Sequence, residues 1–262
     1  MRKSVLKKVY VFFYSLFIFI IHIPFVFAKH KPALEYKTKL LRIETTGSNG
    51  SSVFFVKTVL TNTVGTAYDS LRLNFMGLSR QAFEYAMKGY DYLVKAGKLG
   101  NEKILSIVDF SQPSNRKRLF VIDLEKFKVL FNTYVAHGKN SGMEYATRFS
   151  NVPESNESSL GFYETLSTYT GKNGYSLQLQ GLESGINDNA NRRTIVMHGA
   201  AYVGESVVQA RGFCGRSFGC PAIPENMKMP IIDKIKNGTC LFIYSPDKKY
   251  LGRSRILHPT GA

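Results

Sequence analysis

Ile195-Val196-Met197-His198-Gly199 is followed, 22 residues beyond its histidine, by a cysteine in Arg216-Ser217-Phe218-Gly219-Cys220-Pro221-Ala222. The first stretch is apolar and partly β-branched, which is typical of a buried strand. Pro221 has no N–H group and disfavours helix at the residue before it, so Cys220 is expected on a turn or an extended segment. The two stretches predict a β framework that presents a thiol beside the end of a strand.

This thiol and this histidine together suit nucleophilic catalysis. The thiolate is the reactive form of cysteine, and a neighbouring base or cation increases its population. His198 is expected to be the base, and the Gly219 and Cys220 amides are expected to stabilise the oxyanion. Ser217 would orient a ring or a substrate group. The alternative is a cysteine that packs as a small buried hydrophobe beside a core histidine.

The spacing also resembles a known family. A His-Gly pair followed some twenty residues later by Ser-x-Gly-Cys resembles the signature of YkuD-type L,D-transpeptidases, cysteine-dependent enzymes that remodel bacterial peptidoglycan. Four stretches resemble the murein L,D-transpeptidase catalytic-domain branch: His137-Gly138-Lys139-Asn140-Ser141-Gly142, Phe149-Ser150-Asn151, Ser158-Ser159-Leu160-Gly161-Phe162-Tyr163 and Gly219-Cys220-Pro221-Ala222. The resemblance covers roughly residues 75 to 250 and implies a YkuD-like β-sandwich with Cys220 as nucleophile.

Two departures from the family pattern affect the assignment of the base. Typical members have a histidine between the serine and glycine of the cysteine motif, where this chain has Phe218. They also have an arginine soon after the cysteine, where this chain has Pro221-Ala222-Ile223. The upstream His198 is therefore expected to serve as the base.

Four more residues are candidates for substrate binding, each with a structural alternative. His137 also ends an apolar run before a glycine, and it either lines the site or makes a structural hydrogen bond. Ser158 and Ser159 either bind substrate amides and carboxylates or belong to an ordinary polar turn. Arg216 either attracts a carboxylate or is a solvated surface residue.

The remaining cysteines and the histidines leave open questions of redox state and metal binding. Cys214 and Cys240 either pair in an oxidising compartment or remain unpaired structural thiols. A zinc site from Cys214, Cys220, His137 and His198 is a weaker alternative because no short ligand spacing supports it. We expect no metal and no other cofactor.

The periodicity of the chain predicts a mostly β, α+β domain with peripheral helices. A helix is expected from an N-cap at Ser79 to Gly97, because apolar residues recur at three- and four-residue spacing. A short helix is expected near residues 230–236. Strands are expected at 104–110, 119–123, 127–136, 176–182, 194–198 and 240–244, with Phe127, Val129, Phe131, Thr133 and Val135 on one face.

The N-terminus reads as a secretory signal. Basic residues precede an apolar stretch from Val9 to Phe27, and Ala28 offers a cleavage site. We expect a signal peptide at 1–28, a spacer at 29–75 and the catalytic domain at 76–262. An uncleaved membrane anchor is the alternative. Loss of the signal's four basic residues lowers the net charge from +16 to +12. This charge suits an acidic cell envelope, because no nucleic-acid-binding module accompanies it.

These inferences predict an exported enzyme of the periplasm or cell envelope that acts on peptidoglycan stem peptides through a Cys220 acyl-enzyme. With water as the acceptor, the same chemistry makes it an L,D-carboxypeptidase. A rival from another class is a non-catalytic protein that binds the cell wall through its positive charge.

Overall fold

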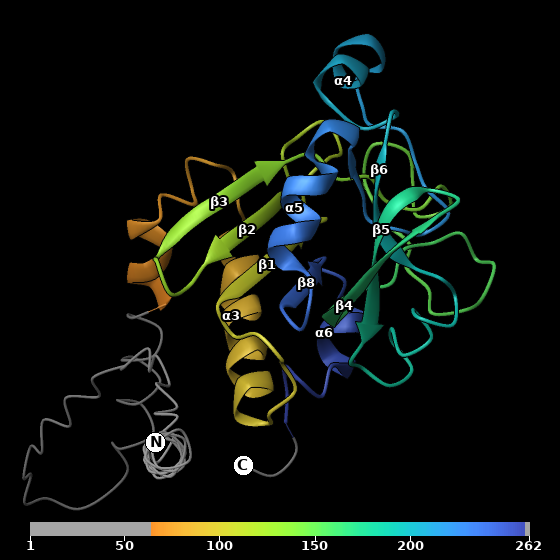
Figure 1. The fold of residues 1–262 in the computed structure, drawn as a ribbon. Helices are drawn as coiled ribbons and strands as arrows, with labels where there is room; N and C mark the ends of the chain where they lie inside the picture. Colours follow the sequence, from red (N-terminus) through yellow and green to blue (C-terminus); the bar gives the residue numbers. More distant parts are fainter. Residues whose placement is uncertain (1–63, 260–262) are drawn as a thin grey trace, which may run out of the picture. The chain divides into compact units, whose positions relative to one another are not determined.

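The computed structural model describes residues 64–259 (Figure 1). The predicted signal peptide and residues 29–63 of the predicted spacer lie outside the described residues, so both stay predictions. Within the described range, every helix is too short or too polar to span a bilayer.

Helix α3 (Arg80–Lys95) is the long helix that the periodicity predicts. Ser79 is its N-cap, and its side chain accepts a hydrogen bond from the amide of Ala82 at 3.4 Å. Phe83, Met87 and Leu93 lie on the buried face of the helix, which packs against strands β1 and β8. This stripe is therefore core packing, as the spacing of the apolar residues indicates.

Eight strands form one sheet in the order β3-β2-β1-β8-β4-β5-β6-β7. The strands are β1 (Ile104–Asp109), β2 (Leu119–Asp123), β3 (Lys128–Thr133), β4 (Gly161–Gly171), β5 (Gly174–Gly181), β6 (Val196–Ala200), β7 (Ala222–Pro224) and β8 (Cys240–Tyr244). The six predicted strands are present. The sequence missed β4, whose far half is polar and largely exposed, and β7, which is only three residues long.

The sheet is mostly antiparallel, as predicted, with parallel pairs only at β1–β8 and β6–β7. Ala136, beyond the end of β3, bridges to Ala222 of β7, and Gly138 bridges to Ser217. The two outer strands of the sheet are thereby brought together, so the sheet is nearly closed. The resemblance implied a β-sandwich, and the described residues form one nearly closed sheet, in which closure pairs edges that an open sheet leaves exposed.

Strand β3 differs from its prediction at both its start and its register. Phe127 lies in the preceding turn with φ +50° and is 47% exposed. Ile122 and Val121 of β2 pair with Val129 and Phe131, so one residue of β3 is bulged out. The expected single face is therefore wrong, because a bulge shifts the alternation by one residue.

The remaining helices are short and lie at the periphery (Figure 1). After α3 they are α4 (Glu205–Arg211), the 3-10 turn η1 (Glu225–Met227), α5 (Lys228–Ile235) and α6 (Lys248–Arg253), and residues 64–70 ahead of α3 are also helical. Helix α5 matches the predicted short helix and buries Ile231, Ile232 and Ile235. Helix α4 buries none of its residues and stands apart from the sheet at the top of Figure 1.

Candidate active site

Cys220 lies on a tight turn that leads into β7. The Ser217 hydroxyl donates to the Cys220 carbonyl at 2.6 Å and accepts from the Gly219 amide at 3.0 Å. Gly219 has φ +124°, and a Cβ there would lie 2.8 Å from the carbonyl oxygen of Glu157. Only glycine fits this turn without strain, and Ser217 ties the turn together.

The same hydrogen bonds change one sequence prediction. The Gly219 amide already donates to Ser217, so it is not free to stabilise an oxyanion. The amide of Cys220 itself lies close enough to its own sulfur to favour the thiolate. Of the two expected oxyanion donors, the structure leaves the Cys220 amide.

Cys220 is buried, with 8% of the residue exposed. Its sulfur accepts from the Val196 amide at 3.5 Å and donates to the Thr194 carbonyl at 3.7 Å. Burial raises the pKa of the Cys220 thiol, and the Val196 amide and the Arg193 charge offset part of this rise. The thiol is therefore protonated at neutral pH, and its activation requires a base.

His198 lies on β6, in register with Ala222 of β7, and lines the same cavity of about 350 Å³ as Cys220. Its Nδ1 is 2.8 Å from the Gly199 carbonyl oxygen. A carbonyl can only accept, so Nδ1 carries the proton and Nε2 is left as the basic nitrogen. This tautomer is the one that a general base requires.

His137 occupies a different environment. Its ring is fully buried, with Nδ1 2.8 Å from an Arg118 guanidinium nitrogen and Nε2 3.3 Å from the Gly142 carbonyl oxygen. Burial and the Arg118 charge lower the pKa of His137 to about 4. His137 does not line the cavity of Cys220, so its hydrogen bonds are structural.

The two candidate serines are also buried, and they hold the turn rather than face the cavity. The Ser158 hydroxyl accepts from the Gly138 amide at 3.0 Å and donates to the Gly219 carbonyl at 3.1 Å. The Ser159 hydroxyl donates to the Ser150 carbonyl at 2.7 Å. Ser158 therefore connects segment 150–159 to the cysteine turn, whereas Ser159 bonds within that segment.

Arg216 and Phe218 do line the cavity. One Arg216 guanidinium nitrogen donates to the carbonyls of Lys139 and Gly142, each at 3.3 Å. Phe218 is 69% exposed, and the Lys139 ammonium lies 4.5 Å from the centre of its ring. The position that holds a histidine in typical family members is therefore an exposed aromatic at the rim.

Among the cavity residues that sequence reasoning missed, Arg193 and Tyr202 are ionisable. Arg193 lies in the loop before β6 and Tyr202 in the loop after it. Neither belongs to a motif or a periodic pattern, so no sequence signal marks them.

A family model described as the L,D-transpeptidase catalytic domain matches residues 74–244, which is more than half of the chain. This chain belongs to that family. The family expected from the His-Gly and Ser-x-Gly-Cys stretches is thereby confirmed. Comparison with curated protein sequences gave no significant match.

Solved structures of L,D-transpeptidases are similar to this family member at low identity. An L,D-transpeptidase from Mycobacterium smegmatis is 12% identical, with a TM-score of 0.35 over 55% of this chain and 59% of that one. The helical cell shape determining protein of Campylobacter jejuni is 14% identical, with a TM-score of 0.37 over 66% of this chain and 61% of that one. The chain spans about three fifths of the length of these structures.

The cysteines of this L,D-transpeptidase domain are all free and buried. The alternative of a Cys214–Cys240 disulfide is therefore wrong for this structure. Cys240 lies within β8, and Cys214 packs in a small apolar cluster with Tyr134 and Val203. Over residues 64–259, no three His, Cys, Asp or Glu side chains converge as metal ligands would, so the four residues of the zinc alternative are not assembled.

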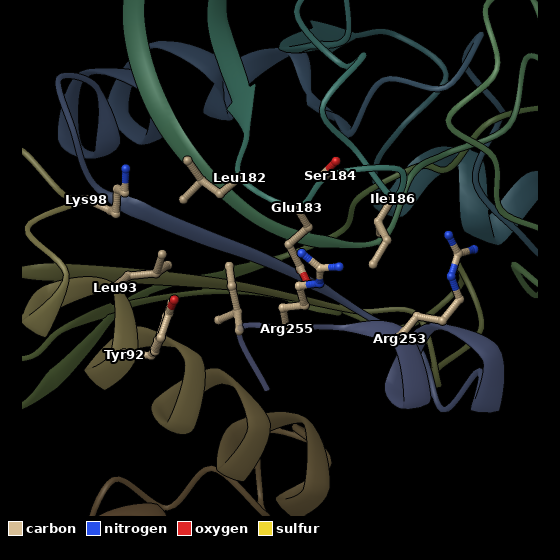
Figure 2. Close-up of a pocket in the computed structure, with 10 residues that line it drawn as sticks. Tyr92, Leu93, Lys98, Leu182, Glu183, Ser184, Ile186, Arg253 and Arg255 are labelled. Atoms are coloured by element: carbon tan, nitrogen blue, oxygen red, sulfur yellow. The ribbon is translucent and has the colours of Figure 1, made fainter. Parts of the chain in front are cut away.

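The domain has a second cavity, of about 400 Å³, which shares no lining residue with the first (Figure 2). Lys98, Arg253 and Arg255 line it together with apolar side chains of α3 and of the segment after β5. Its buried carboxylate, Glu183, accepts hydrogen bonds from the Phe162 amide at 2.9 Å and the Tyr250 hydroxyl at 3.0 Å. It contains neither a thiol nor an imidazole, so thiol chemistry belongs to the first cavity.

Proposed function

We propose that this protein is an exported peptidoglycan L,D-transpeptidase in which Cys220 is the nucleophile and His198 the general base. One observation carries the proposal: Cys220 and His198 line one cavity, and the Gly199 carbonyl holds His198 in the tautomer whose Nε2 is basic. Membership of the L,D-transpeptidase family supports the reaction class.

In the first step, His198 Nε2 takes the thiol proton and the Cys220 sulfur attacks the carbonyl of an L-residue in a stem peptide. The negative charge on the carbonyl oxygen is stabilised by the Cys220 amide. Collapse of this intermediate breaks the C–N bond, and His198 returns the proton to the departing nitrogen. The products are a free D-amino acid and a thioester on Cys220.

In the second step, an amine of another stem peptide attacks the thioester. His198 takes a proton from the amine, the new C–N bond forms, and the C–S bond breaks as the sulfur regains a proton. If water attacks instead, the product is a trimmed stem with a free carboxylate. The outcome depends on how completely the bound acceptor excludes water from the cavity.

Charge complementarity supports a carboxylate-bearing substrate. Two arginines, Arg193 and Arg216, line the cavity, and no Asp or Glu side chain does. Arg216 is bonded through only one of its guanidinium nitrogens, and only at 3.3 Å, so it can bind the terminal carboxylate of the departing D-residue. In this proposal the substrate is not bound by Ser158, Ser159 or His137, whose hydrogen bonds stabilise the segments around the cavity.

Mass spectrometry of tetrapeptide-containing muropeptides after incubation with the purified mature chain tests the proposal. We expect crosslinked dimers and released D-amino acid. Cys220→Ala should form neither, whereas Cys214→Ala, which also removes a buried thiol, should form both. Trimmed stems alone would replace transpeptidation by carboxypeptidation. Unchanged muropeptides with salt-sensitive wall binding would support the binding protein instead.

A further inference from the structure

Arg193 makes an unusually complete set of hydrogen bonds for a half-buried side chain. One terminal nitrogen donates to the Ser150 carbonyl at 2.7 Å and the Ser159 hydroxyl at 2.5 Å. The other donates to the Ser155 hydroxyl at 3.1 Å and the Glu157 carbonyl at 2.8 Å. The guanidinium therefore holds segment 150–159 at four points.

This segment is in turn bonded to the cysteine turn. Ser158 lies between two of the groups that Arg193 binds, and its hydroxyl donates to the Gly219 carbonyl. Arg193 itself approaches this turn, because a Cβ on Gly219 would lie 3.5 Å from an Arg193 terminal nitrogen. Arg193 is thus linked, through segment 150–159 and Ser158, to the backbone that carries Cys220.

The charge of Arg193 is not cancelled by a close carboxylate. Its four acceptors are neutral oxygens, and no ion pair within 4.0 Å involves it in the part of the chain that the structure describes. The other ionisable groups that line the cavity around Cys220 are His198, Tyr202 and Arg216. The Glu157 carboxylate also acts on the Arg193 charge, but its ion pair, at 3.5 Å, is with Arg148.

We propose that Arg193 is a positioning residue that holds the cysteine turn through segment 150–159 and supplies a positive charge that favours the Cys220 thiolate. The inference rests on the proposed role of Cys220 as the nucleophile. An opposite charge nearby favours the ionised form of a buried group, and Coulomb attraction is stronger where water is excluded. In agreement, the Arg193 charge lowers the pKa of Cys220 against the larger effect of burial.

The experiment measures alkylation of Cys220 by iodoacetamide across pH, resolved by peptide mass spectrometry. The sulfur forms the new S–C bond, iodide leaves, and the thiol proton passes to solvent. The rate therefore follows the thiolate fraction whether or not the protein is a transpeptidase. Cys214 and Cys240 are fully buried and serve as internal references.

Two substitutions separate the charge of Arg193 from its hydrogen bonds. Arg193→Gln keeps some hydrogen bonds and loses the charge, and we expect the pH midpoint of alkylation to rise by about one unit, which slows the reaction at pH 7 by about tenfold. Arg193→Lys keeps the charge and loses most of the hydrogen bonds, so its midpoint should stay close to that of the wild type.

Arg192→Gln is the matched control, because Arg192 is the exposed arginine next to Arg193 in the chain and does not line the cavity. Its midpoint should not move. Equal slowing in Arg193→Gln and Arg193→Lys with an unchanged midpoint would overturn the charge role. If Arg193→Gln fails to fold, Arg193→Lys still decides, since a midpoint raised by one unit in that variant contradicts the proposal. A shifted midpoint without muropeptide turnover would overturn the transpeptidase function alone.

Discussion

Two His-Gly pairs end runs of β structure in this domain, and only one of them belongs to the cavity. His137-Gly138 and His198-Gly199 both place a ring at the end of an apolar run, with a glycine next to it. The His137 ring is enclosed between Arg118 and the Gly142 carbonyl. The His198 ring shares a cavity with Cys220.

The difference lies in what binds Nδ1. At His137 an arginine donates to this nitrogen, so the ring's basic atom is occupied and a positive charge opposes protonation. At His198 a carbonyl accepts from Nδ1, so the basic atom is Nε2. The same dipeptide therefore serves as a structural unit in one place and as a candidate base in the other.

The largest expected effect is that of losing the His198 ring on the rate of Cys220 acylation. Removing a general base costs about 10² to 10⁴ in rate, so His198→Ala should slow acylation of Cys220 at pH 7 by at least the lower figure. The defect should shrink only above pH ~8.5, the ordinary thiol value, because burial raises the pKa of Cys220. Stopped-flow acylation by a chromogenic activated ester across pH measures this.

His137→Ala is the matched control in the same assay, and its pH dependence should follow that of the wild type. A changed pH profile in His137→Ala together with a normal one in His198→Ala would exchange the two roles.

His137 should instead control stability in acid. Its pKa is about 4 in the folded chain, against about 6.5 for an ordinary histidine. The unfolded chain then binds more protons between these values, so stability is fully present above pH ~6.5 and falls as the pH approaches 4. The shift corresponds to about 3 kcal/mol. Urea unfolding at pH 7 and pH 4 should show this loss in the wild type and not in His137→Asn.

Ser141→Ala provides the control for that measurement. It removes the acceptor of the Ser158 amide, a buried hydrogen bond near His137 without a titrating group, and should lower stability equally at both pH values. An acid loss in His137→Asn as large as in the wild type would assign the effect to other groups.

The smallest expected effect is the difference in the free energy of unfolding between alanine substitutions at Gly138 and at Gly199. A Cβ on Gly138 would run into the backbone carbonyl of Asn156, whereas one on Gly199 would meet the ends of the flexible side chains Glu225 and Lys228. Gly138→Ala should therefore lower the free energy of unfolding by about 1–3 kcal/mol, and Gly199→Ala should lower it by less. Urea unfolding at pH 7 compares them, and a larger cost at Gly199 would contradict the assigned close approach.

Local pattern was sufficient wherever neighbours in sequence are also neighbours in space. The period of apolar residues after Ser79 located helix α3. Strand β2 has the predicted bounds because its first four residues are apolar and turn residues lie on both sides of it. The motif around Cys220 was enough to identify the family, because its glycine and proline restrict the backbone locally. Phe127 and the bulge in β3 escaped prediction because register depends on the partner strand.

What the sequence by itself determined is the mostly β class, the main elements, the family and a candidate thiol, Cys220, with two candidate histidines, of which it favoured His198. Only the tertiary structure decided which histidine reaches the cavity, that the sheet nearly closes on itself, and that Arg193 stands beside the thiol. These outcomes depend on contacts between segments far apart in the chain. Arg118 and Arg193 have the same side chain, yet the surrounding fold places one against a histidine ring and the other in the lining of the cavity that contains Cys220.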